Sequence, residues 1–244
     1  MSWHLDRLAA FDVETTGPEP TEARIVTAAI SVNGGGALDE PYSWLIDPGV
    51  EIPEGAIAVH GITNEKARAE GAPPAKAIGE ILEVLTTQLA AGVPIVAFNA
   101  RFDMTILDRE ARRHGLATLD ERVGAEGSVH VIDPHVLDKQ IDRYRKGKRT
   151  LTAVCEHYGV IFEDAHTAVA DAVAAAAIAR CLGEKDESLR ALCLADLHSG
   201  QIAWAAEQAQ SLQDYFQRQG REEQVEGAWP LIPFEDSSEH QQAA

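Results

Sequence analysis

The sequence predicts an α/β fold whose strands form one central sheet. Two observations support this. Three short apolar stretches come first, are separated by Gly, Pro and Asn residues, and have the composition of strands; they span 7–13, 24–32 and 42–47. A strand–helix–strand–helix series follows, as in domains that cover a sheet with helices. Its expected strands are 94–98 and 128–133, and its expected helices are 102–115, 150–159 and 166–183.

The remaining elements follow from apolar residues at helical spacing and from glycine or proline stops. The spacing predicts a helix over 75–90, which Gly92 and Pro94 close. The segment before that helix holds Pro53, Pro73 and Pro74, and we expect it to be irregular.

A change of composition at 183–188 predicts a boundary in the chain. We predict a domain over residues 1–183 and a C-terminal helical extension over residues 184–244. Two amphipathic helices are expected in the extension, at 188–198 and 201–219. Its last ten residues are polar, and we expect them to be disordered.

The bulk composition indicates a soluble, reduced, cytoplasmic protein. No stretch approaches the ~20 consecutive apolar residues of a membrane span, and the N-terminus lacks the basic leader of a signal peptide. The three cysteines show no C-x-x-C spacing, which argues against a disulfide framework and a zinc site. The net charge of −18 disfavours broad, non-specific adhesion to nucleic acid or anionic membranes.

Two acids, Asp12 and Glu14, lie one residue apart in the apolar first strand. Side chains at i and i+2 of a strand face the same way, so these carboxylates point together and repel each other. Either one of them takes a proton or a cation lies between them. Hard divalent ions such as Mg²⁺ prefer oxygen ligands. For an isolated D-x-E, however, two solvated acids at an exposed strand end are the more common explanation.

Two further segments carry candidate site residues. Asp103 follows the strand at 94–98 and opens a helix, where α/β sheets commonly place ligand groups, although a plain helix N-cap also fits. His166 and Asp171 are separated by about 140° if both are helical, so they converge only if His166 lies in the loop before the helix. A histidine so placed could accept a proton from water, but a capping or surface histidine is the simpler alternative.

The motifs DxETTG, N-A-x-F-D and H-x-A-x-x-D occur in this order, at Asp12, Asn99 and His166. Together they resemble the DEDDh exonucleases, the family of the epsilon proofreading subunit, oligoribonuclease and ribonuclease T. The resemblance covers roughly residues 5–183. The segment IPEGAIAVHGIT, at 52–63, adds to it, because proofreading-type members carry a similar V-H-G-I segment.

The resemblance implies a ribonuclease-H-like fold with a mixed central sheet flanked by helices. It implies that Asp12, Glu14 and Asp171 hold two Mg²⁺ or Mn²⁺ ions, that Asp103 helps through water, and that His166 is the general base. It also implies contacts around the 3′-terminal nucleotide from Thr15, Thr16, Val59, His60, Asn99 and Phe102. Many relatives have His where this chain has Phe98, a departure that affects supporting packing or hydrogen bonds and no catalytic acid.

The expected function is a metal-dependent 3′→5′ exonuclease of proofreading or repair type. It would act mainly on single-stranded DNA ends and release nucleoside 5′-monophosphates, with a polymerase or sliding clamp as a possible partner. One alternative is a 3′→5′ exoribonuclease acting on short RNA. A second, from another class, is a non-catalytic scaffold that binds nucleic acid or a polymerase.

Three other segments allow two interpretations each. The basic segment at 138–150 could hold a phosphate backbone or could be solvated and flexible. The sequence QSLQDYF, at 210–216, resembles a clamp-binding peptide but better fits one face of an amphipathic helix. The sequence WPLIPF, at 229–234, could pack against the domain or meet a partner.

Overall fold

A five-stranded mixed sheet forms the centre of the molecule. The computed structural model describes residues 2–125, 127–162 and 167–235. In the described residues the strand order is β3-β2-β1-β4-β5. β1 (Leu8–Thr15), β2 (Ile25–Asn33) and β3 (Glu40–Leu45) form an antiparallel meander, while β4 (Ile95–Val96) and β5 (Val131–Ile132) continue the sheet parallel to β1. The predicted fold class is confirmed.

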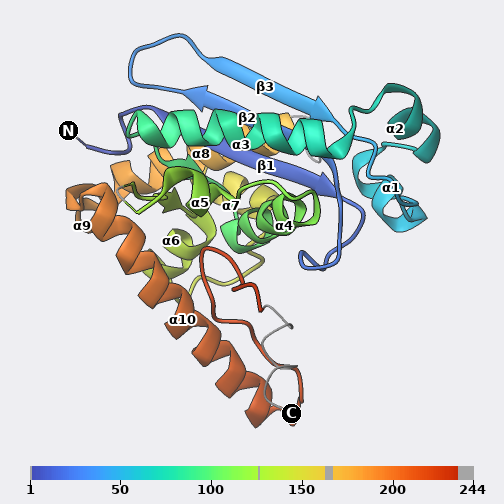
Figure 1. Ribbon diagram of the computed structural model, residues 1–244. Coiled ribbons are helices and arrows are strands. Elements are labelled where there is room, and N and C mark those ends of the chain that lie inside the picture. The colour runs from blue at the N-terminus through green and yellow to red at the C-terminus, as the bar shows by residue number, and fades with distance from the viewer. Residues whose placement is uncertain (1, 126, 163–166, 236–244) are drawn as a thin grey trace, which may run out of the picture.

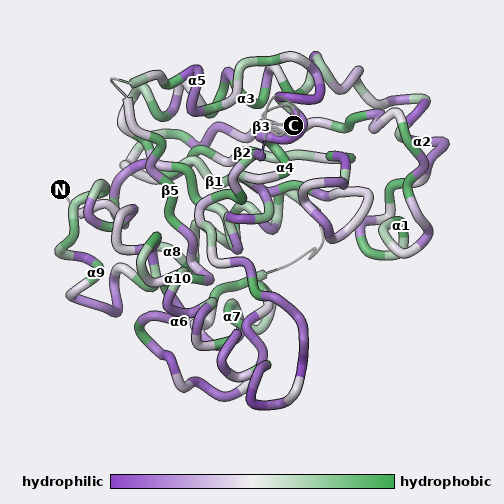
Figure 2. The backbone as a smooth tube through the Cα atoms, turned by 60° about the horizontal axis from the view of Figure 1, so that its bottom comes forward, coloured by the Kyte–Doolittle hydropathy of each residue, from purple (hydrophilic) through white to green (hydrophobic). Residues whose placement is uncertain are grey.

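Helices cover both faces of this sheet (Figure 1). Alternate residues of β1 point to opposite layers. Phe11 and Val13 pack with α3 (Pro74–Ala90) and α4 (Ala100–Arg113), whereas Leu8 and Ala10 pack with α7 (Leu151–Tyr158) and α8 (Ala168–Lys185). In Figure 2 the central strands are coloured as mostly hydrophobic and the outer loops as largely hydrophilic.

Four short helices lie where the sequence analysis expected none: α1 (Glu54–His60), α2 (Asn64–Glu70), α5 (Leu119–Val123) and α6 (Pro134–Ile141). The expectation that the segment before residue 75 is irregular was therefore wrong. Its prolines stand at helix starts, where a missing N–H costs nothing. Pro53 precedes α1, and the Thr63 hydroxyl caps α2 by accepting a hydrogen bond from the Lys66 amide.

The helical C-terminal part contains α9 (Glu187–Ala191) and α10 (Leu194–Arg218). The break falls at Leu192–Cys193 and not at 199–200, so the predicted boundary between these helices was wrong. Gly200 lies inside α10, where the Trp204 ring comes within 3.0 Å of the position that a Cβ would take. The sequence QSLQDYF forms part of α10, which confirms its helical interpretation. Figure 1 shows α10 running away from the sheet, with the chain after it returning toward the domain.

The returning chain packs against the domain. The buried Trp229 joins the core beside the sheet, and the Ile232 amide donates a hydrogen bond to the Thr105 hydroxyl at 2.9 Å. The Arg109 guanidinium donates to the carbonyl oxygens of Ile232 and Pro233, at 2.8 and 2.9 Å. Of the two interpretations of WPLIPF, the structure shows packing against the domain. The domain boundary at 183–184 remains a prediction.

Candidate active site

Three carboxylates gather at the end of the central strand. Single oxygen atoms of Asp12, Glu14 and Asp171 all lie within 4.8 Å of one another. Asp12 and Glu14 come from β1, and the pairing of β1 with β2 shifts register just after Glu14. Asp171 comes from the first turn of α8, which Thr167 caps by accepting a hydrogen bond from the Ala170 amide.

The small side chains on the buried face of α8 allow this helix to lie close to the acids of β1. The helix buries a row of small residues against the sheet, among them Ala172, Ala175, Ala176 and Ala179. Small side chains let the helix backbone come close to the strand. The alanine-rich sequence therefore brings Asp171 to Asp12.

Asp103 lies beside this trio and is held by the backbone of β1. Its side chain is buried, and its Oδ1 accepts a hydrogen bond from the Val13 amide at 3.2 Å. Val13 lies between the two strand acids, so Asp103 fixes the strand from which both project. Asp103 is not among the three carboxylates that converge within 4.8 Å.

The electrostatics of the cluster favour protons or cations. Burial raises the pKa of Asp12 well above its usual range, and the neighbouring Asp103, Asp171 and Glu14 raise it further. Burial and Asp171 raise the pKa of Glu14 to about 7. Burial also raises the pKa of Asp103, with Asp133 and Glu14 adding to the effect. Convergent carboxylate oxygens are the donor set that Mg²⁺ and Mn²⁺ accept, so the residues fit a divalent cation.

A pocket of about 510 Å³ opens next to Glu14. It is lined by β1 and the loop after it, by α1 and by Phe102 of α4. Its residues include Glu14, Thr15, Thr16, Val59, His60 and Phe102. The structure thus brings five of the six predicted substrate contacts into one pocket beside the acids.

Several of these side chains are fixed by local hydrogen bonds. The Thr15 hydroxyl donates to the Gly17 carbonyl at 2.8 Å, and the Thr16 hydroxyl accepts from the Arg24 amide at 2.9 Å. His60 Nδ1 accepts from the Ile62 amide at 3.1 Å, so Nε2 carries the proton of the neutral ring. That Nε2 is buried without a hydrogen bond among the described residues, and burial lowers the pKa of His60. The Thr15 backbone opposes this lowering of the pKa, but burial is the larger effect, so the His60 ring stays neutral at neutral pH and forms part of the pocket wall.

Asn99, the sixth predicted contact, lies elsewhere. It occupies the left-handed region with a φ of 65° and begins the turn into α4. It lines a separate narrow hollow of about 80 Å³ together with Arg101 and His135. The centre of the Phe98 ring lies 5.4 Å from the centre of the His135 ring, so the two aromatic side chains pack together beside this turn.

A buried carboxylate that the sequence analysis did not select holds this turn. Asp133 Oδ1 accepts from the Asn99 amide at 2.9 Å, and its Oδ2 accepts from the Ala100 amide at 3.0 Å. The Asp133–Pro134 sequence carried a signal, because Asp before Pro is typical of a helix start. Two residues of the C-terminal part also reach Asp133: the Trp229 indole donates to Oδ2 at 3.2 Å, and Gln201 Oε1 accepts from the Asp133 amide at 2.7 Å. Nothing in the sequence around these two indicated such a contact.

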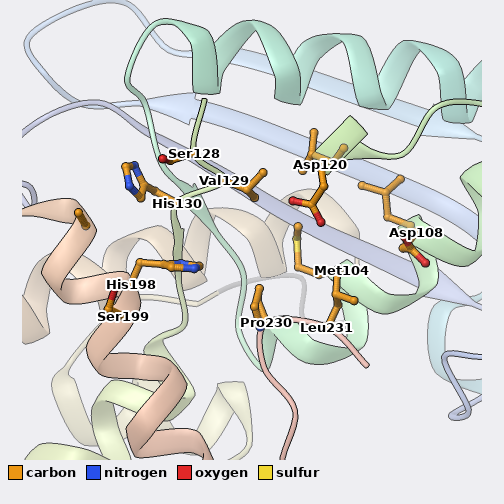
Figure 3. Close-up of a pocket in the computed structure, with 13 residues that line it drawn as sticks. Met104, Asp108, Asp120, Ser128, Val129, His130, His198, Ser199, Pro230 and Leu231 are labelled. Carbon is orange, nitrogen blue, oxygen red and sulfur yellow. The ribbon is translucent and has the colours of Figure 1, made fainter. Parts of the chain in front are cut away.

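A second cavity, of about 420 Å³, lies away from the acids, between α4, α5 and the start of α10. Figure 3 shows His130 and His198 on one side of it and Asp120 on the other, with Pro230 and Leu231 closing it from the returning chain. None of the predicted site residues lines it. His166 lies outside the described residues, so its role as general base remains a prediction.

The fold and the carboxylates together define a class: an α/β protein whose buried acids form a site suited to divalent cations. The chain belongs to the exonuclease family RNase_T. The family model matches residues 9–179.

Two curated relatives illustrate the family. A DNA polymerase III subunit epsilon-like protein of Rhodobacter capsulatus is 32% identical over 179 residues, covering 70% of this chain and 23% of that protein. A PolC-type DNA polymerase III of Lacticaseibacillus paracasei is 31% identical over 165 residues, covering 67% of this chain and 10% of that protein. The chain therefore spans less than a quarter of the length of either relative.

Solved structures show the same fold. Escherichia coli exonuclease I in complex with a dT13 oligonucleotide matches with a TM-score of 0.63 and 22% identity, over 75% of this chain and 42% of that one. Exonuclease I from Methylocaldum szegediense matches with a TM-score of 0.62 and 23% identity, over 75% of this chain and 41% of that one. These similarities confirm the predicted ribonuclease-H-like architecture.

Proposed function

We propose that this protein is a metal-dependent 3′→5′ exonuclease that removes nucleotides from single-stranded DNA ends. The observation that carries the proposal is the convergence of Asp12, Glu14 and Asp171 within 4.8 Å, next to a pocket of about 510 Å³. Such a pocket has room for one terminal nucleotide. Hydrolysis at the acids would release it as a nucleoside 5′-monophosphate.

Asp12, Glu14 and Asp171 would hold two Mg²⁺ or Mn²⁺ ions, with Asp103 contributing through water. When bound, the ions supply an activated water and charge stabilisation at the phosphate and the leaving oxygen. His166 is proposed as the base that accepts the proton of that water.

The protein's own residues would bind and orient the 3′-terminal nucleotide. Phe102 offers a ring on which a base can stack, and the neutral His60 ring lines the same pocket. Thr15 and Thr16 have their hydroxyls engaged with the backbone, so they shape the pocket wall. Val59 is 54% exposed and offers an apolar surface at the pocket.

DNA is the proposed substrate because the curated relatives are named as DNA polymerase III proteins and a structural neighbour binds a dT13 oligonucleotide. We propose a proofreading or repair role, with a polymerase or clamp as partner. Among the described residues, no helix is long and apolar enough to cross a bilayer.

The test is a time course with 5′-labelled DNA and RNA oligonucleotides of equal sequence, in Mg²⁺, Mn²⁺ or EDTA. We expect a ladder that shortens from the 3′ end, depends on the metal and forms faster on DNA. A faster ladder on RNA would assign the same site to an exoribonuclease. Binding without cleavage of either substrate would contradict the enzymatic proposal and leave the scaffold alternative.

A further inference from the structure

A cleft of about 310 Å³ lies between α6, the chain that follows it and α10. We name it the cation cleft; it is lined by Lys139, Arg143, Arg149, Gln208, Ser211, Leu212 and Tyr215. Three of these side chains are cationic and none is acidic. The chain as a whole carries a net charge of −18, so a cleft lined by cations and no acids contrasts with its overall acidity.

Ion pairs within the protein neutralise only part of this positive charge. Arg149 pairs with Asp138, as does Arg145, so the basic segment at 138–150 is partly structural. Lys139 and Arg143 form no ion pair within the part of the chain that the structure describes. Burial lowers the pKa of the Lys139 ammonium, and the nearby Arg149 and Arg101 lower it further, against the opposing effect of Asp133 and Asp138. An anion entering the cleft would meet at least two cations without a carboxylate partner.

An apolar and aromatic surface lies beside these cations. Tyr215 is 49% exposed and Leu212 is 42% exposed, both on α10. Gln208 Nε2 donates to the Val136 carbonyl at 3.1 Å and thereby holds α10 against α6. Cations next to an exposed aromatic ring form the combination that binds single-stranded nucleic acid, with phosphates on the charges and bases on the rings. An acidic peptide would use the charges alone.

The cation cleft continues toward the candidate active site. Lys139, Gln208 and Leu212 also line the narrow hollow that reaches Asn99 and Arg101. The next residue along the chain, Phe102, lines the pocket beside the acids. The start of α4 therefore separates the nucleotide pocket from the hollow, and the hollow, which Asp133 and Glu226 also line, adjoins the cation cleft through the shared residues.

We propose that the cation cleft binds the upstream part of the single strand whose 3′ nucleotide enters the pocket beside Glu14. This inference rests on the proposed exonuclease function and extends it to the substrate's path. The family match ends at residue 179, so α10, which forms one wall of the cleft, lies beyond it. The cleft makes longer single strands the preferred substrates of this chain.

The experiment compares wild type with Lys139→Ala/Arg143→Ala. The matched control is Lys66→Ala/Lys76→Ala, which removes two exposed charges from α2 and α3. First, kcat/KM is measured for dT2 and dT10. We expect the dT10 to dT2 ratio to fall about tenfold or more in the cleft variant and to stay at the wild-type value in the control. An unchanged ratio in the cleft variant would overturn the proposal.

Fluorescence anisotropy measures the binding of labelled dT10 in EDTA, where no metal supports cleavage. This assay tests the role of the cleft in binding independently of catalysis. The slope of log Kd against log salt should become shallower by about 1.4, because each lost phosphate contact removes about 0.7 on single strands. Tyr215→Ala should weaken binding about fivefold or more, and Tyr215→Phe should retain it. If wild type binds in this way but cleaves nothing, the cleft stands and the proposed activity fails. Displacement of dT10 by hexaglutamate as readily as by unlabelled dT6 would overturn the assignment to nucleic acid.

Discussion

At the scale of single residues, the three carboxylates that suit a metal ion also lower the stability of the metal-free fold. Asp12, Glu14 and Asp171 repel one another wherever they are all ionised, and Asp12 carries the added cost of burial. A divalent cation offsets both costs. The same side chains should therefore destabilise the metal-free protein and stabilise it when Mg²⁺ or Mn²⁺ is present.

Asp12→Asn should raise the melting temperature in EDTA at pH 8 and reduce the increase that Mg²⁺ produces. Asn removes the charge and keeps nearly the same volume. Relief of about 1 kcal/mol corresponds to ~2–4 °C for a chain of this size. Differential scanning calorimetry with and without Mg²⁺ checks both effects. A lower melting temperature in EDTA, or an undiminished Mg²⁺ effect, would show that Asp12 is not a ligand.

The pKa of Glu14 predicts how metal-free stability depends on pH. Folding raises this pKa from 4.5 to about 7, so the folded state binds the proton more tightly than the unfolded state does. The associated stability is fully present below pH 4.5 and is lost as the pH rises through about 7. Glu14 is partly exposed, which reduces the effect to about 1 kcal/mol. In EDTA, the melting temperature of wild type relative to Glu14→Gln should thus fall by ~2–4 °C between pH 5 and pH 8. A pH-independent difference would refute the shifted pKa.

At the scale of elements, the turn into α4 depends on the C-terminal part of the chain. Asp133 holds the amides of Asn99 and Ala100, one helical turn before Asp103, and Trp229 and Gln201 in turn hold Asp133. These two hydrogen bonds join residues that are 96 and 68 positions apart in sequence. The position of Asp103 therefore depends on elements outside the matched family region.

Trp229→Phe should test this dependence, because it removes the indole N–H and keeps an aromatic ring. We expect a loss of about 1 kcal/mol in the free energy of unfolding. We also expect kcat to fall several-fold with KM nearly unchanged, since the turn that carries Asp103 loses one support. Trp204→Phe is the control: Trp204 is on α10 and makes no side-chain hydrogen bond among the described residues. Equal effects of the two substitutions on kcat would assign Trp229 a packing role only.

The sequence predicted the elements that have local signals and missed those that depend on distant partners. The three meander strands, α3, α4, α7 and α8 follow from periodicity with glycine or proline stops. α1 and α2 were missed because each is a 7-residue helix with at most one buried residue, which leaves no apolar periodicity to find. The break before α10 was misplaced at 199–200, because Gly200 lies inside the helix, where the Trp204 ring packs against it. The acids were found because all of them stand in local motifs, but Trp229 and Gln201 meet Asp133 only in three dimensions.

At the scale of the whole molecule, the returning chain joins the C-terminal part to the domain. Arg109 is 8% exposed, pairs with Asp108, and donates hydrogen bonds to two carbonyl oxygens of that chain. The Phe234 ring lies over the Arg109 and Arg112 guanidinium groups, at 5.2 and 4.6 Å. Without the segment 221–235, Arg109 would lose its carbonyl partners and the core would lose Trp229.

A chain ending at Gly220 should therefore melt at least ~5 °C lower than the full chain, a loss of 2 kcal/mol or more for a protein of this size. The control ends at Glu235 and lacks only residues 236–244. We expect it to melt as the full chain does, since it keeps Trp229, Ile232 and Phe234 with their contacts to the domain. Thermal melts of the three proteins decide the matter. An unchanged melting temperature in the shorter chain would show that the returning segment contributes nothing to the fold.

The central claim is that the trio of Asp12, Glu14 and Asp171 hydrolyses single strands from the 3′ end with the help of divalent cations. The most direct measurement follows 5′-labelled dT10 with wild type and Asp171→Asn side by side, in Mn²⁺. The account predicts a ladder from the 3′ end with wild type and at least a hundredfold lower rate with the variant, whose melting temperature in EDTA should be no lower than that of wild type. Cleavage by the variant at the wild-type rate, or release of the labelled 5′ nucleotide first, would contradict it.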